Sequence, residues 1–73
     1  MTVVKVTLLD CSAPLWRLST SQRQLWRRAD GTLMVSGQPV EAVKVDGDTV
    51  TLRGFAGRWW SIRRADYERV NAL

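Results

Sequence analysis

The sequence predicts a small β-rich α+β protein: a twisted antiparallel sheet, or an SH3-like partly open barrel, of about four to five strands with one short helix. Three observations predict this class. Runs rich in β-branched residues recur along the chain, Asp-Gly and Gly-Gln-Pro turn signals separate several of them, and the length of 73 residues provides for one thin core. We therefore expect a single domain over residues 1–73.

The N-terminal segment is the first predicted strand. Residues 2–9, TVVKVTLL, are rich in β-branched residues and place Val4, Val6 and Leu8 on one face. Pro14 ends the regular structure, because it lacks an amide hydrogen and restricts the residue before it.

Residues 15–29, LWRLSTSQRQLWRRA, are compatible with two structures. A helix over about 20–29 is favoured, because a capping-box pattern precedes it and Leu25 and Trp26 then share its apolar, core-facing side. The alternative is a β-hairpin around the Asp-Gly pair that follows, which is a strong hairpin signal.

The second half of the chain predicts strands more clearly. TLMVSG forms a short strand, and VEAVKV and TVTLRG form a hairpin around DGD. In that hairpin we expect Val43 and Val45 to lie on one face, with Val50 and Leu52 opposite them across the turn. After the connector GFAG, RWWSIRR is the last strand.

The C-terminal segment ADYERVNAL is expected to form a short helix or an irregular tail. In either form Tyr67 and Val70 can pack back on the sheet.

Trp59 and Trp60 are neighbours in the last predicted strand, so their side chains point to opposite faces of the sheet. Trp60 shares a face with Ile62, and we expect it in the core. Trp59 shares a face with Ser61 and Arg63. It is therefore either an exposed aromatic ringed by arginines or a side chain packed under another element.

Trp16, in the stretch APLWRL, has the same two alternatives. A turn that buries Leu15 and Leu18 pushes Trp16 outward, whereas a different turn places it in the core. If it is exposed, Leu15, Trp16 and Arg17 form a compact apolar anchor with a basic rim.

The charge is unevenly distributed along the chain. The formal net charge is +4, and residues 11–29 and 53–64 contain arginines but no acid. Residues 30–52 between them hold four acids and one lysine. We expect a basic and an acidic side if the two basic stretches lie near one another in the fold.

Several function classes are excluded by composition. One cysteine and no histidine exclude a disulfide framework, the usual zinc sites and the commonest general base. Cys11 is expected to be a half-buried filler, and the aspartates of VDGDT are turn residues. We predict a protein that is not an enzyme, with no catalytic residues, no metal and no cofactor.

The sequence also predicts the compartment. No apolar run approaches the about 20 residues that span a bilayer, and MTVVKVTLLD lacks the pattern of a signal peptide. We expect a cytoplasmic protein with no membrane partner.

Two binding functions remain. The first is a non-enzymatic regulatory protein that binds a larger protein machine through an apolar anchor with basic neighbours. The predicted contact residues are Lys5, Leu15, Trp16, Arg17, Arg23, Arg27 and Arg28. The alternative is a small basic barrel that binds single-stranded nucleic acid by stacking and phosphate contacts. Its residues are Arg53, Arg58, Trp59, Arg63 and Arg64.

The small, basic, arginine- and tryptophan-rich chain opens with MTVVKVTLLDCSAPLW and closes with RWWSIRRADYERVNAL. In these features it resembles the small proteins that lytic phages make to bind and reprogram host RNA polymerase, of the Xanthomonas-phage transcription regulator type. The resemblance implies bacterial RNA polymerase as partner, contact near its RNA exit region, displacement of the initiation factor and read-through of terminators, all in the host cytoplasm. It assigns no role to individual residues.

Overall fold

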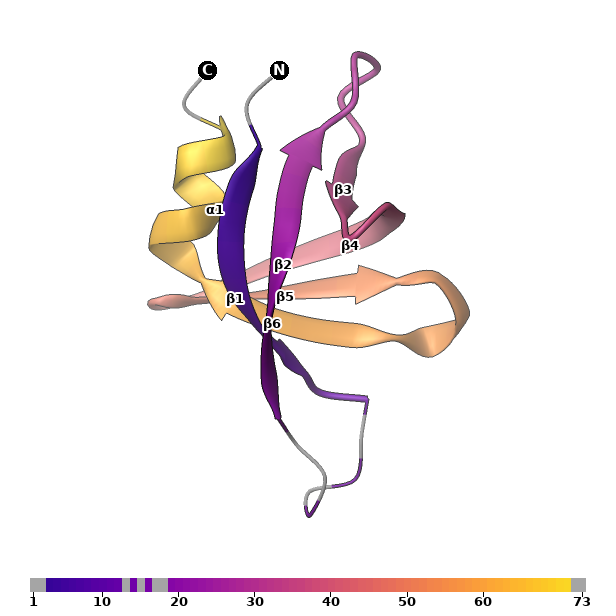
Figure 1. Ribbon diagram of the computed structural model, residues 1–73, viewed down its shortest axis with the longest axis vertical. Helices are drawn as coiled ribbons and strands as arrows, with labels where there is room; N and C mark the ends of the chain where they lie inside the picture. Colours follow the sequence, from indigo (N-terminus) through magenta and orange to yellow (C-terminus); the bar gives the residue numbers. More distant parts are fainter. Residues whose placement is uncertain (1–2, 13, 15, 17–18, 72–73) are drawn as a thin grey trace.

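The computed structural model describes residues 3–12, 14, 16 and 19–71. Within this part of the chain, six antiparallel strands form one sheet, each strand pairs with the next, and the sheet closes into a barrel (Figure 1). The elements are β1 (Val4–Asp10), β2 (Thr20–Arg27), β3 (Leu33–Val35), β4 (Gln38–Asp46), β5 (Thr49–Gly54), the 3-10 turn η2 (Phe55–Gly57), β6 (Trp59–Arg63) and helix α1 (Arg64–Asn71). A small antiparallel sheet with a short helix is confirmed, but the predicted four or five strands are too few, and the barrel is closed rather than partly open.

The predicted helix at 20–29 is wrong, because this segment is strand β2. β2 pairs with β1 on one side and with β3 on the other. The turn after it has the hairpin chemistry of the alternative prediction: Gly31 has a φ of 90°, and the carboxylate of Asp30 accepts from the N–H of Thr32 at 2.9 Å. A helix here would leave one edge of β1 unpaired, so the long-range pairing decides the structure.

The predicted core position of Trp26 is corrected for the same reason. In a strand, neighbouring side chains face opposite sides, so Leu25 and Trp26 cannot share a face. Leu25 is fully buried inside the barrel, whereas Trp26 is half-buried on the outer face, opposite Met34 of β3.

The core fills the inside of the barrel with alternate residues of the strands. The predicted inward faces of β1 and β6 are confirmed. The buried apolar cluster is Val4, Val6, Leu8, Leu25, Leu33, Val35, Val50, Leu52, Trp60, Ile62 and Val70. Burial of these side chains is the main force that stabilises so small a domain.

The predicted hairpin of β4 and β5 is also confirmed. Val43 lies opposite Leu52, and Val45 lies opposite Val50. Val50 and Leu52 are fully buried, but Val43 and Val45 remain more than one third exposed. The far half of β4 therefore extends beyond the core.

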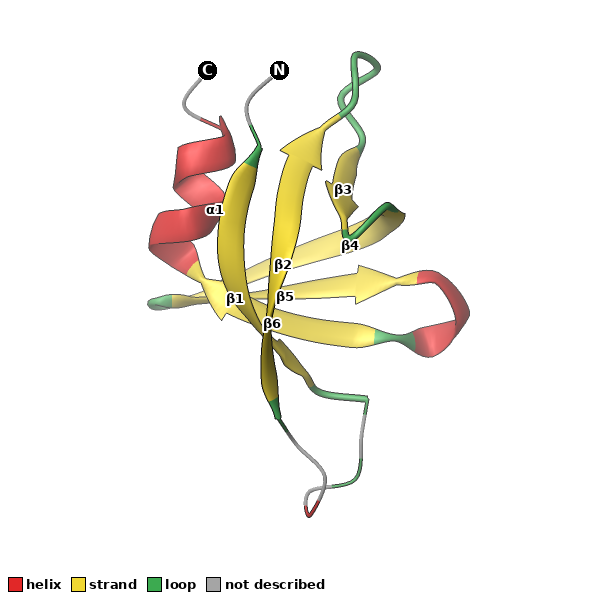
Figure 2. Cartoon of the chain, in the orientation of Figure 1, coloured by secondary structure: helices red, strands yellow, loops and turns green. Residues whose placement is uncertain are grey.

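Helix α1 lies against one end of the barrel, beside β1 (Figure 2). Val70 is buried in the core and Tyr67 packs against it, as the sequence predicts. The guanidinium of Arg27, at the end of β2, donates to the Asn71 side chain and to the carbonyl of Gly31. No helix in the described residues is long and apolar enough to cross a membrane.

The connector between β5 and β6 brings the main chain close to the core. Gly54 is buried, and a Cβ at this position would collide with the six-membered ring of Trp60. Ala56, in the η2 turn, has a φ of 59°, a left-handed conformation that is costly for a residue with a side chain. This turn leaves Phe55 67% exposed.

Candidate binding surfaces

The outer face of β5 and β6 brings together three residues of the predicted nucleic-acid site. Arg53 lies directly opposite Trp59, and its guanidinium carbon is 5.6 Å from the centre of the indole ring. Arg63 follows on the same face of β6 by the alternation of the strand. Trp59 is 42% exposed, so the exposed alternative is the one that the structure shows. The guanidinium is attracted to the face of the indole ring, and this contact restrains both side chains.

The main chain of Trp59 is held by the start of the β1–β2 loop. Its N–H donates to the hydroxyl of Ser12 at 2.7 Å, and its carbonyl accepts from the N–H of Cys11 at 2.9 Å. Cys11 is exposed, so the prediction of a half-buried filler is wrong. Partial desolvation of the thiol, and then the charge of Asp10, raise the pKa of Cys11 above its ordinary value.

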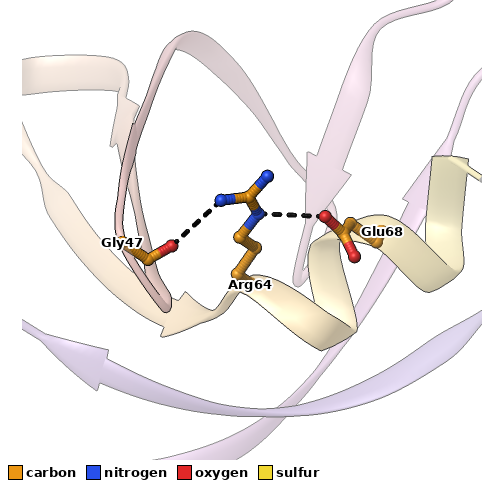
Figure 3. A network of polar contacts seen from close by, with 3 residues as sticks. All are labelled: Gly47, Arg64 and Glu68. Carbon is orange, nitrogen blue, oxygen red and sulfur yellow. Dashed lines mark hydrogen bonds and ion pairs between the residues drawn. The ribbon is translucent and has the colours of Figure 1, made fainter.

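The other two residues of this predicted site lie elsewhere. Arg58 has the same inward register as Trp60 and lies at the end of the barrel remote from α1. Arg64 begins α1, where its Nε donates to Glu68 at 2.9 Å and its Nη1 to the carbonyl of Gly47 at 3.3 Å (Figure 3). Arg64 therefore ties the helix to the β4–β5 turn.

The predicted protein-binding site begins with the loop between β1 and β2. Trp16 is 82% exposed, so its outward alternative is the one observed. Leu15 and Arg17, predicted beside it, lie outside the described residues.

Arg27 and Arg28 do not join this loop. They are at the far end of β2, and a strand of 8 residues separates its ends by roughly 25 Å. Arg27 is bound to α1, and Arg28 forms an ion pair with Asp30 at 3.2 Å. The seven predicted contact residues therefore do not form one continuous surface.

Lys5 and Arg23 do come together, in a shallow hollow of about 720 Å³ beside β1 and β2 that we call the β1–β2 hollow. Its lining residues are Val3, Lys5, Gln22, Arg23, Gln24, Ser36 and Gly37, which include no acid.

A second hollow, of about 260 Å³, opens at the end of the barrel remote from α1; we call it the barrel mouth. Its lining is Leu8, Val35 and Trp60 from the core, with Asp10, Ser21, Arg23, Ser36, Gln38 and Arg58. Sequence reasoning missed this site. The signal was available, because strand alternation places Asp10 with Leu8, Arg23 with Leu25, and Arg58 with Trp60. It could be used only once β2 was known to be a strand.

In the described part of the chain, no group of three or more acidic or cysteine side chains lies in the arrangement that a metal ion requires. No protein-family model matches the sequence, and comparison with curated proteins and with solved structures gives no match.

Proposed function

We propose that this chain is a small non-enzymatic regulatory protein that binds a larger protein machine. The best candidate for that machine is bacterial RNA polymerase, on which the protein inhibits initiation and promotes read-through of terminators. The choice of polymerase and the effects on initiation and termination follow from the resemblance to small phage regulators, and the exposed apolar side chain of Trp16 supports binding to a protein surface.

The observation that carries the proposal is the exposure of Trp16. At 82% it is the most exposed of the large hydrophobic side chains in the described residues. Because most of its surface is exposed, Trp16 adds little buried apolar area to the barrel, whereas tryptophan is among the commonest hot-spot residues in protein interfaces.

The test is a pull-down from nuclease-treated host lysate on the tagged protein, washed at low salt and at about 0.5 M salt. We expect RNA polymerase subunits to be retained in stoichiometric amounts. Trp16→Ala should lose them while its circular dichroism spectrum stays unchanged, because the Trp16 side chain is 82% exposed and is not part of the buried core.

Trp59→Ala is the matched control, since it removes a second exposed tryptophan from a different surface. It should retain the polymerase. Retention by Trp16→Ala, or loss of all partners from the unmodified protein on nuclease treatment, contradicts the proposal.

A second candidate function is binding of single-stranded nucleic acid on the outer face of β5 and β6. It is favoured by the stacking of Arg53 on Trp59, with Arg63 on the same face. An exposed ring stacks on a base of any sequence, and neighbouring guanidinium groups contact phosphates.

This candidate is tested by fluorescence anisotropy with a labelled oligothymidylate. Binding should weaken with salt, by about 0.7 log units per log unit of salt for each neutralised phosphate. Trp59→Ala should weaken it by about ten-fold or more, and Trp16→Ala should not. The opposite pattern of the two variants, or no binding at low salt, refutes a stacking role for Trp59.

A further inference from the structure

Strand β3 is too short to cover the whole edge of β2. The two strands pair only from Leu25 to Arg27, and in the described residues no strand pairs with that edge of β2 from Thr20 to Arg23. The carbonyl of Gln24 still accepts from the N–H of Ser36 at 2.9 Å, so the main-chain groups of Gln24 face away from β1. Strand alternation then turns the N–H and carbonyl of Gln22 toward the same open edge.

The carbonyl of Gln22 on this edge accepts a hydrogen bond from the guanidinium of Arg23 at 2.9 Å. An exposed strand edge is a template for pairing with an extended chain. Here the template is short, and the side chain of Arg23 covers part of it.

Three hollows adjoin along this edge. The β1–β2 hollow and the barrel mouth share Arg23 and Ser36. The barrel mouth shares Gln38 and Arg58 with a third hollow of about 390 Å³, which we call the Phe55 hollow. The Phe55 hollow is lined by Gly37, Gln38, Pro39, Phe55, Ala56 and Arg58. The shared residues place the three hollows next to one another, and we call this row of hollows the edge groove.

The chemistry of the edge groove is basic in the middle and apolar at both ends. Lys5, Arg23 and Arg58 line it, against the single acid Asp10. Val3 at one end is 48% exposed, and Phe55 at the other is 67% exposed. Arg23 and Arg58 are both exposed, so their guanidinium groups can form charge-assisted hydrogen bonds with a carboxylate that enters the barrel mouth.

From this arrangement we propose that the edge groove binds an extended acidic segment of a partner protein. The segment pairs its main chain with Gln22, places a carboxylate in the barrel mouth between Arg23 and Arg58, and rests an apolar side chain on Phe55. Strand addition supplies affinity, and the side chains that alternate into pockets supply selectivity. The inference deepens the proposed function, on which it rests for the identity of the protein that carries the segment.

An acidic peptide fits the edge groove better than a nucleic acid. Its three cations stand beside an acid, and a peptide carboxylate needs one or two arginines, whereas a polynucleotide needs a row of cations along its backbone. An extended segment of six residues is about 20 Å long, comparable to the 20 Å and 24 Å shorter dimensions of the molecule.

The test is an NMR titration of the labelled full chain with an acetylated, amidated hexapeptide of alternating valine and glutamate. Its valine and glutamine counterpart is the uncharged control. We expect saturable shifts of the Gln22 amide and the Trp60 indole signals, with a dissociation constant on the order of 1 mM or below. The glutamine peptide should bind about three- to ten-fold more weakly.

Arg58→Gln should weaken binding of the glutamate peptide by a similar factor. The fold should stay intact, because the Arg58 side chain is exposed. Arg63→Gln, which removes a cation from the outer face, is the matched control and should bind as the unmodified protein does. Equal binding of the two peptides, or no shift at these signals, overturns the proposal. An oligothymidylate that moves the signals when the peptide does not reassigns the edge groove to nucleic acid.

The two proposals fail separately. If the peptide binds but no protein machine is retained from the host lysate, the edge-groove proposal stands and the proposed function is refuted. A retained machine without peptide binding refutes the edge groove alone.

Discussion

At the scale of single residues, neighbouring tryptophans in β6 have opposite roles. Trp60 is 6% exposed and is one of the core residues that line the barrel mouth, whereas Trp59 lies under Arg53 on the outer face. This division was predictable from the sequence, because it depends only on the two-residue repeat of a strand. The exposure of Trp16 was not decided by the sequence, since no periodic pattern fixes the direction of a loop side chain.

Gly54 sets how closely β5 approaches Trp60. We expect Gly54→Ala to lower the free energy of unfolding by about 2 kcal/mol, because the added Cβ enters the space of the buried ring. Chemical denaturation measures this. The φ of Gly54 is −108°, so an alanine adds no backbone strain and the effect is steric.

Combining Gly54→Ala with Trp60→Leu provides the control. Trp60→Leu alone should destabilise by leaving a cavity, but the two changes together should cost less than their sum, since the smaller side chain makes room for the Cβ. Strictly additive losses would contradict a collision at this site.

At the scale of elements, the turn between β2 and β3 depends on the ionised form of Asp30. Hydrogen bonds from Thr32, and then the charge of Arg28, hold the pKa of Asp30 below its ordinary value of 3.8. Because the pKa of Asp30 is lower in the folded state, the ionised carboxylate stabilises the hairpin when the pH is above the ordinary pKa. This contribution is lost as the pH falls through the folded-state pKa.

The measurement is an NMR pH titration of the Thr32 amide. We expect its midpoint below 3.8, and we expect Asp30→Asn, which keeps the acceptor oxygen, to remove the transition. A midpoint at or above 3.8 would show that the hydrogen bond does not favour the carboxylate.

The elements differ in how well the sequence predicts them. The β4–β5 hairpin and its register follow from local signals, namely alternation around a tight turn. β2 does not, because a capping-box pattern and an Asp-Gly turn compete within the same 15 residues. The competition is settled by pairing with β1, which is distant in sequence and invisible to local propensity.

At the scale of the whole molecule, the barrel separates its charged residues into distinct surfaces. α1 covers one end, and the short β3 leaves the other end accessible. Arg23 and Arg58, which the sequence assigns to two different candidate sites, meet at the barrel mouth, whereas Arg27 and Arg64 are used to hold α1 in place. Neither grouping can be derived before the closure of the sheet is known.

The most direct test of the central claim is transcription by purified bacterial RNA polymerase from a promoter followed by a terminator. The account predicts that the protein lowers the number of transcripts initiated and raises the fraction that reads through the terminator. Trp16→Ala should abolish both effects, and Trp59→Ala should retain both. Unchanged initiation and termination in the presence of a molar excess of folded protein would contradict the claim that it regulates this enzyme.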